Sequence, residues 1–129
     1  MNKKFNNWLN NLKEAWESLN PEKAANLFSR DVKYYESALK MPCENWDQVY
    51  DLWKVIPNNQ KSAVFSFSIL FTQANFCVAN WQVERVLLPQ NSRQKIDGIF
   101  IFSLNSENLC NYFKQWRTAE TAPGSQKTF

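Results

Sequence analysis

Apolar residues in the first twenty positions recur at steps of three and four. The residues that form this stripe are Phe5, Trp8, Leu9, Leu12, Trp16 and Leu19. Such spacing is typical of a helix with one buried face, and it predicts a helix over about Lys3–Ser18. Asn20-Pro21-Glu22 then indicates the start of a short second helix, because Asn is a favoured N-cap and Pro fits the first helical position.

The next part of the chain predicts a short aromatic strand, a loop and a third helix. Residues 31–37 are rich in β-branched and aromatic side chains, which favour a strand, and residues 38–44 contain a proline and read as a loop. Asn45 followed by Gln48 gives a capping-box pattern. The helix that it begins is expected to carry four residues on one face: Trp46, Val49, Tyr50 and Trp53.

The third helix is expected to end before Pro57-Asn58-Asn59, and from Ser62 onward the apolar pattern changes to a period of two. It predicts strands from Ser62 to the turn at Gln73, and over Phe76–Leu88, Lys95–Leu104 and Leu109–Thr118. On the second of these strands one face carries Ala79, Trp81, Val83 and Arg85, and the other carries Asn80, Gln82 and Glu84.

This order of elements predicts an α+β domain. N-terminal helices are expected to lie on a strongly curved, mainly antiparallel sheet, giving a cone that encloses a pocket. Residues 1–118 are expected to form one domain and residues 119–129 a flexible C-terminal tail.

Composition narrows the possible chemistry. The chain has 129 residues, 16% of them aromatic, with 6 Trp and 10 Phe, so rings are expected to line an interior as well as fill it. The net charge of +3 is interspersed, which argues against a nucleic-acid partner. The absence of histidine excludes imidazole chemistry within this chain. Catalysis would use carboxylates, tyrosines, arginines, lysines or thiols.

Cysteines and terminal segments add expectations about environment. Cys43, Cys77 and Cys110 are far apart and form no Cys-x-x-Cys pattern, so their spacing indicates neither a disulfide framework nor a metal site. We find no apolar run long enough to span a bilayer and no leader-like start. We therefore expect a cytoplasmic protein with no cofactor and no membrane partner.

Several motifs occur in a characteristic order. They are Trp16, Leu27-Phe28-Ser29, Asp31-Val32, Tyr34-Tyr35-Glu36, the aromatic helix through Trp53, the Trp81 strand, Asp97-Gly98-Ile99-Phe100 and Tyr112-Phe113-Lys114-Gln115-Trp116. Together they resemble the nuclear transport factor 2-like superfamily and, more narrowly, its SnoaL-like (polyketide cyclase-like) branch. The resemblance implies a cone with an internal pocket and frequent dimers through the sheet. It implies no single activity, because the superfamily includes isomerases, dehydratases, cyclases, epoxide hydrolases and non-catalytic binders.

The resemblance also implies candidate catalytic residues. Glu36 lies where steroid-isomerase-like members carry a general-base carboxylate. The protonated acid of those members falls near Ile99, for which Asp97 is a possible substitute. Arg85 and Asp97 correspond to two parts of the Asp-Arg-Asp set of epoxide-hydrolase members, without its tight spacing. Cyclase and dehydratase members typically use histidine, which this chain lacks.

Each candidate has a structural alternative. Glu36 can instead be a solvated strand-end carboxylate. Arg85 can bind an anionic ligand group or form a structural ion pair with Glu36 or Asp97, and we favour the ion pair. Lys114 and Arg117 are expected on a solvated rim.

Two functions from different classes follow. The first is binding of an unknown small apolar ligand, with or without carboxylate acid–base catalysis of the isomerase, cyclase or hydrolase type. Its pocket is expected to be lined by Trp16, Tyr34, Trp46, Tyr50, Trp53, Trp81 and Trp116, although tryptophans at such spacing are more often core residues. The second is a non-catalytic dimerisation or protein-interaction module. A homodimer is expected in either case, because the outward residues of the long strands include Phe and Val.

Overall fold

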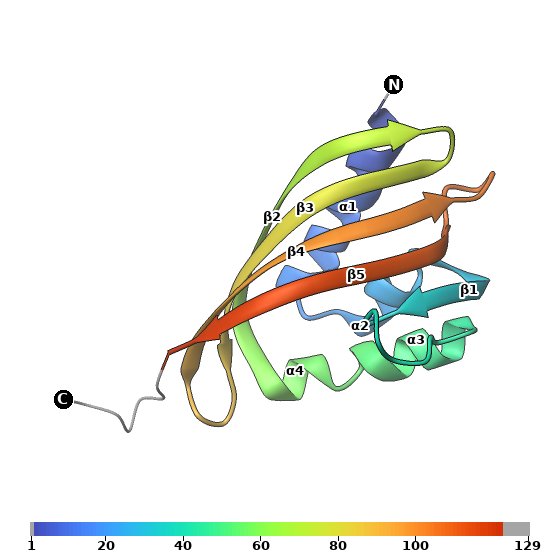
Figure 1. Ribbon diagram of the computed structural model, residues 1–129. Helices are drawn as coiled ribbons and strands as arrows, with labels where there is room; N and C mark the ends of the chain where they lie inside the picture. Colours follow the sequence, from blue (N-terminus) through green and yellow to red (C-terminus); the bar gives the residue numbers. More distant parts are fainter. Residues whose placement is uncertain (1, 123–129) are drawn as a thin grey trace.

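The computed structural model describes residues 2–122 and shows helices lying against one face of a twisted sheet (Figure 1). The elements in chain order are α1 (Lys3–Glu17), α2 (Pro21–Ala25), β1 (Phe28–Tyr35), α3 (Trp46–Trp53), α4 (Ile56–Asn59), β2 (Gln60–Gln73), β3 (Phe76–Leu87), β4 (Ser92–Leu104) and β5 (Cys110–Thr121). The five strands form one sheet in the order β1-β5-β4-β3-β2. β1 runs parallel to β5, and the other neighbouring pairs are antiparallel. The expected α+β class and mainly antiparallel sheet are confirmed.

Two helices begin at the caps that the sequence predicts. Asn20 Oδ1 accepts a hydrogen bond from the Lys23 backbone N–H at 3.0 Å, at the start of α2. Asn45 Oδ1 accepts one from the Gln48 backbone N–H at 2.9 Å, at the start of α3. The return bond of the expected capping box is shifted by one residue, because Gln48 Oε1 accepts from the Glu44 backbone N–H at 2.7 Å. These bonds satisfy donors that a helix end otherwise leaves unpaired.

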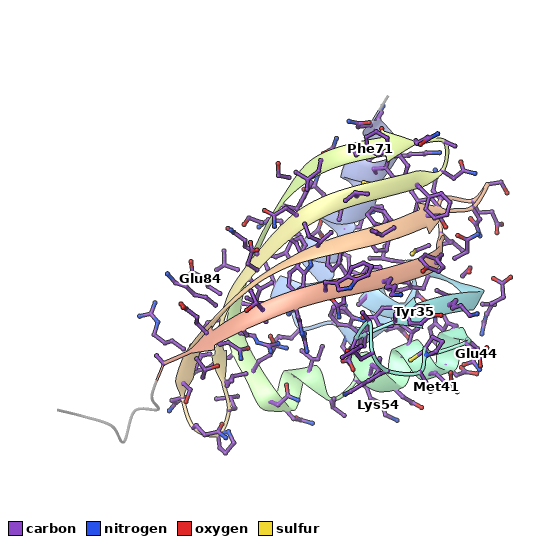
Figure 2. The ribbon with its side chains drawn as sticks, viewed as in Figure 1. Tyr35, Met41, Glu44, Lys54, Phe71 and Glu84 are labelled. Atoms are coloured by element: carbon purple, nitrogen blue, oxygen red, sulfur yellow. The ribbon has the colours of Figure 1, made fainter. Side chains whose placement is uncertain are left out.

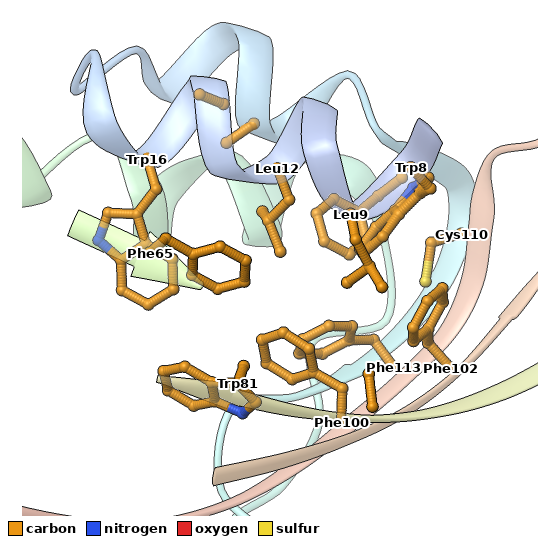
Figure 3. Packing of buried hydrophobic residues seen from close by; sticks show 14 of the residues in the cluster. Trp8, Leu9, Leu12, Trp16, Phe65, Trp81, Phe100, Phe102, Cys110 and Phe113 are labelled. Atoms are coloured by element: carbon orange, nitrogen blue, oxygen red, sulfur yellow. The ribbon is translucent and has the colours of Figure 1, made fainter. Parts of the chain in front are cut away.

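The core is an aromatic layer between α1 and the inner face of the sheet (Figure 3). Trp8 stacks on Phe102 with ring centroids 4.7 Å apart, near one end of α1. Near the other end, the ring centroid of Trp16 lies 5.7 Å from that of Trp81. Trp81 in turn stacks on Phe100 at 4.8 Å with an interplanar angle of 11°. Burial of such rings, together with their offset stacking, holds the helix on the sheet.

Two details differ from the sequence-based expectation. A further short helix, α4, follows the third one and was not expected; Pro57 lies in its first turn, where the missing N–H costs no helical hydrogen bond. The expected tail begins too early, since residues 119–121 belong to β5 and Ala119 pairs with Ile96. β4 starts at Ser92 and therefore offers these residues a partner. Ala122 is also held, because its N–H donates to the Arg93 carbonyl oxygen at 2.8 Å, and only residues 123–129 of the expected tail lie outside the described residues.

Gly98 on β4 is required by the aromatic core. A Cβ atom at this position would lie 2.6 Å from the Trp116 carbonyl oxygen and 2.6 Å from Trp81 Nε1. Neither the backbone oxygen of β5 nor a fully buried indole can move without disturbing the stack on Phe100.

We therefore predict that Gly98→Ala destabilises the protein by about 1–3 kcal/mol, the usual cost of overpacking. Urea denaturation followed by tryptophan fluorescence measures this change. Ser68→Ala, at an exposed position on β2, is the control and should change stability by less than about 0.5 kcal/mol. Equal unfolding midpoints for the two variants would show that the sheet relaxes around the added methyl group.

Candidate functional site

A cavity of about 400 Å³ lies between the helices and the inner face of the sheet. We call it the inner cavity. Its apolar lining residues are Leu12, Trp16, Phe28, Leu52, Trp53, Val55, Ile56, Leu87, Leu88, Phe100 and Phe113. Its polar and ionisable lining residues are Tyr34, Glu36, Asn59, Gln60, Arg85, Gln90, Gln115 and Arg117.

The period of the strands explains why one part of the inner cavity is polar. On β3 the inward positions run from buried Trp81 through Val83 to half-buried Arg85. On β5 the inward positions after Phe113 are Gln115 and then Arg117. Successive inward residues on each strand thus change from aromatic to cationic as the strand leaves the core. One side of the cavity consequently has aromatic walls, and another presents hydrogen-bond donors.

Tyr34 and Glu36 line the inner cavity from β1 and the residue just beyond its end. Tyr34 is buried, and burial raises the pKa of its phenol, with a further rise from the Glu36 carboxylate. The phenol is therefore a neutral hydrogen-bond donor at physiological pH. Glu36 is half-buried, and its backbone carbonyl accepts a hydrogen bond from Gln115 Nε2 at 2.7 Å. This bond fixes the end of β1 against β5 and so positions the Glu36 side chain.

Two buried donors at the inner cavity have no partner. Gln60 Oε1 accepts a hydrogen bond from Trp16 Nε1 at 3.2 Å, but Gln60 Nε2 makes none. Trp53 Nε1 lies near the Tyr34 hydroxyl and likewise lacks a hydrogen bond of good geometry. A buried donor without an acceptor costs about 1–3 kcal/mol. Gln60 and Trp53 both line the inner cavity, so these two donors lie close to any molecule that the cavity holds.

Arg85 brings a positive charge to the same cavity. Its Nε donates to Gln94 Oε1 at 2.8 Å. Burial lowers the pKa of Arg85, and the nearby charge of Arg117 lowers it further. The ion pairs within residues 2–122 are Lys13–Glu17, Lys23–Glu14 and Lys54–Asp51. Neither arginine therefore has an acidic partner in the described part of the chain.

The structure brings together one part of the site predicted from the sequence. Glu36, Arg85, Trp16, Tyr34 and Trp53 all line the inner cavity. The roles assigned to them remain predictions. The ion pair that we favoured for Arg85 is wrong, because no described carboxylate pairs with it.

The expected position of Asp97 in this site is also wrong. Asp97 is exposed on the outer face of the sheet, where it accepts hydrogen bonds from Asn80 Nδ2 at 3.2 Å and Gln82 Nε2 at 3.1 Å. On β4 the even-numbered residues face inward, as buried Ile96 and Phe100 show, so Asp97 points away from Arg85. The register between β3 and β4, which the sequence alone does not give, decides this.

Four aromatic residues expected in the pocket lie elsewhere. Trp46 and Tyr50 stack on each other at 5.5 Å and are half-buried, because the buried face of α3 is formed by its other aromatic and aliphatic residues. Trp81 is fully buried in the core beneath Phe100 and does not line the inner cavity. Trp116 is exposed on the outer face of the sheet.

Sequence reasoning missed five polar residues of the site, namely Asn59, Gln60, Gln90, Gln115 and Arg117. Gln115 and Arg117 follow Phe113 at a period of two, and this signal could have placed them on the inward face. Arg117 was expected on a solvated rim; it is exposed, and it also lines the inner cavity. Gln60 gave no signal, because it lies where α4 passes directly into β2.

Within residues 2–122 no helix is long and apolar enough to cross a membrane. The same residues contain no group of three or more Cys, Asp or Glu side chains arranged to hold a metal ion.

Comparison with known proteins rests on structure. No family model and no curated protein matches the sequence. A putative isomerase from Bacillus subtilis has a TM-score of 0.78 at 10% identity, covering 90% of this chain and 87% of that one. SalBIII, an epoxide hydrolase/cyclase-like enzyme in pyran ring formation of salinomycin, has a TM-score of 0.77 at 12% identity, covering 90% and 92%.

A third structure carries a description of the fold itself. It is a hypothetical protein with a ketosteroid isomerase-like fold from Catenulispora acidiphila, with a TM-score of 0.73 at 9% identity, covering 84% of this chain and 83% of that one. This chain has the nuclear transport factor 2-like fold. At these identities the likeness establishes the nuclear transport factor 2-like architecture and leaves the reaction and the ligand open.

The placement of Glu36 predicts a change in the reactivity of Cys43. The Cys43 thiol is half-buried, which raises its pKa, and the Glu36 and Asp51 carboxylates raise it further. Glu36→Gln removes one negative charge, so the thiolate fraction at pH 8 and the rate of alkylation by iodoacetamide should rise. Mass spectrometry of the Cys43 peptide measures that rate. Cys77, whose pKa burial raises to about 11, is an internal reference that should stay unmodified.

Glu44→Gln is the matched control for this measurement. Glu44 is exposed and adjacent to Cys43 in sequence, but it is not among the charges that raise the Cys43 pKa. Equal rates in the two variants would mean that the Glu36 carboxylate is directed away from Cys43.

Proposed function

We propose that this chain binds a small, largely apolar molecule in the inner cavity. The observation that carries the proposal is the cavity itself, whose volume of about 400 Å³ lies between aromatic walls and unpartnered donors. Ligand sites typically occupy about 300–1,000 Å³ and combine apolar walls with a few placed polar groups. A domain whose aromatics served only as core would fill this space with side chains.

An acid–base reaction is the catalytic form of this proposal. Glu36 offers a carboxylate that can accept a proton, and neutral Tyr34 offers a hydroxyl donor to the same cavity. The two residues are two positions apart in the chain and both line the cavity, so one ligand can contact both. Proton abstraction beside a polarised carbonyl uses this combination of groups. The isomerase and the epoxide hydrolase/cyclase-like enzyme with the same fold support chemistry of this class. We also propose that the chain belongs to the SnoaL-like branch.

The proposal predicts that a neutral apolar probe binds in the cavity and that filling the cavity expels it. Phenylnaphthylamine should bind with one molecule per chain and increase in fluorescence. Ile56→Trp, at a lining position on α4, should weaken binding about tenfold or more, since overpacking costs about 1–3 kcal/mol. Fluorescence titration measures both affinities.

Val64→Trp is the matched control, because it adds the same ring at an exposed position on the outer face of β2. The affinity of the Val64→Trp variant for phenylnaphthylamine should equal that of the unmodified chain. Equal weakening by both tryptophan variants, or by neither, would place the probe outside the inner cavity and contradict the proposed function.

We also propose that the chain forms a homodimer through the outer face of the sheet. Phe71, Phe76 and Trp116 are 59%, 48% and 43% exposed there, and Ile99 lies beside Trp116 on the neighbouring strand. Figure 2 shows Phe71 projecting from β2 near one end of the sheet. Monomers seldom expose several large apolar side chains on one face. A second copy of the same face is the simplest cover for them, because a two-fold interface is self-complementary.

Light scattering should therefore give about twice the 15.2 kDa chain mass at micromolar concentration. Trp116→Lys should shift the mass toward the monomer, because it places a charge in the interface. Leu39→Lys, an equivalent change at an exposed loop position, should leave the dimer intact. A monomeric mass for the unmodified chain would reject the dimer.

A further inference from the structure

Two arginines reach the inner cavity from strands that are not neighbours. Arg85 lies on β3 and Arg117 on β5, with β4 between them. Both residues line the inner cavity, so both positive charges lie beside any molecule that the cavity holds. Two like charges in one cavity repel each other, and the partial burial of Arg85 weakens the solvation that would compensate its charge.

The hydrogen bonds of Arg85 leave most of its donors free. A guanidinium group has five N–H donors in a planar fork. Only the Nε donor of Arg85 has a described partner, the Gln94 side chain at 2.8 Å. The two terminal nitrogens of a guanidinium group can bind a carboxylate or phosphate as a bidentate pair. In Arg85 both are therefore available to a ligand.

The remaining acid of the inner cavity forms no ion pair with either arginine. The ion pairs within residues 2–122 are made by other residues, and the Glu36 carboxylate is not among them. Ionisable lining residues of the described chain consist of two arginines and one glutamate besides the neutral tyrosine, so the cavity has an excess of positive charge.

A third donor lies on the same side as Arg85. Gln60 is fully buried, and its position on β2 pairs with Leu87, two residues beyond Arg85 on β3. Its Nε2 group lacks a hydrogen-bond partner, and Gln60 is one of the residues that line the cavity. An oxygen of an anionic group can accept from this amide as well as from the guanidinium.

We propose that the ligand of the inner cavity is an apolar molecule that ends in an anionic group, a carboxylate, sulfonate or phosphate, held by Arg85 and Arg117 with Gln60 as an additional donor. The apolar part lies against the aromatic walls formed by residues such as Trp16 and Phe100. This inference rests on the proposed function, because it names the class of ligand for the same cavity.

Two fluorescent probes of nearly the same shape test the inference. Anilinonaphthalenesulfonate is an anion, and phenylnaphthylamine is its neutral counterpart without the sulfonate. The quantity measured is the ratio of their affinities, counting only the binding that Ile56→Trp removes. In the unmodified chain the ratio should favour the anion, and it should fall as ionic strength rises, because salt screens the attraction.

The arginine variants should lower this ratio. Arg85→Leu should reduce it by about tenfold or more, the loss expected for hydrogen bonds to a charged group. Arg85→Lys retains the charge without the planar fork, so it should give a smaller reduction. Arg117→Gln alters an exposed side chain with little risk to the fold and keeps the test decisive if Arg85→Leu does not fold. Arg93→Leu, which removes an exposed arginine nearby on β4, is the control and should not alter the ratio.

The outcomes separate the inference from the proposed function. Cavity binding of phenylnaphthylamine together with an equal anion ratio in Arg85→Leu, Arg117→Gln and Arg93→Leu would overturn the anionic ligand and leave the proposed function standing. Failure of Ile56→Trp to remove either probe would overturn both. Loss of the ratio in the two cavity variants, with the Arg93→Leu ratio intact, supports the inference.

Discussion

The aromatic layer between α1 and the sheet is the constraint on which the rest of the structure depends. Trp81 stacks on Phe100 and contacts Trp16, so helix and sheet are held at a separation set by ring thickness. This stack requires glycine at position 98, because a side chain there would clash with both the Trp81 indole and the backbone of β5. The inner cavity begins where this layer ends. Its volume is thus a consequence of where the large rings stop and shorter or polar side chains follow.

Much of the fold follows from local patterns in the sequence. The stripe of α1, the caps at Asn20 and Asn45, and the period of two in the later strands each depend on neighbours within a few residues, and the structure contains all of them. The α+β class follows from their order. The short helix α4 and the extension of β5 past Thr118 were not predicted, because they depend on a partner segment rather than on local preference.

The site was harder to derive, since it depends on register between strands. Arg85 was placed on the correct face of β3 from its own alternation, but Asp97 on β4 was expected to share the site and faces the other way. A strand fixes which of its residues share a face, and only pairing fixes which face is inside. Gln60 depends on still less local information, because its side chain is held by Trp16, 44 positions away in the chain.

The edge of the sheet limits how copies of this chain can associate. β2 is an edge strand of 14 residues, and a long free edge is a template for pairing with another strand. Its pairing with β3 shifts register twice, between Lys61 and Val64 and again between Ile69 and Phe71. Such irregularities bend and twist a strand, so the backbone groups along β2 do not present one continuous straight ladder. Open-ended strand addition along β2, the route to fibres, is thereby disfavoured.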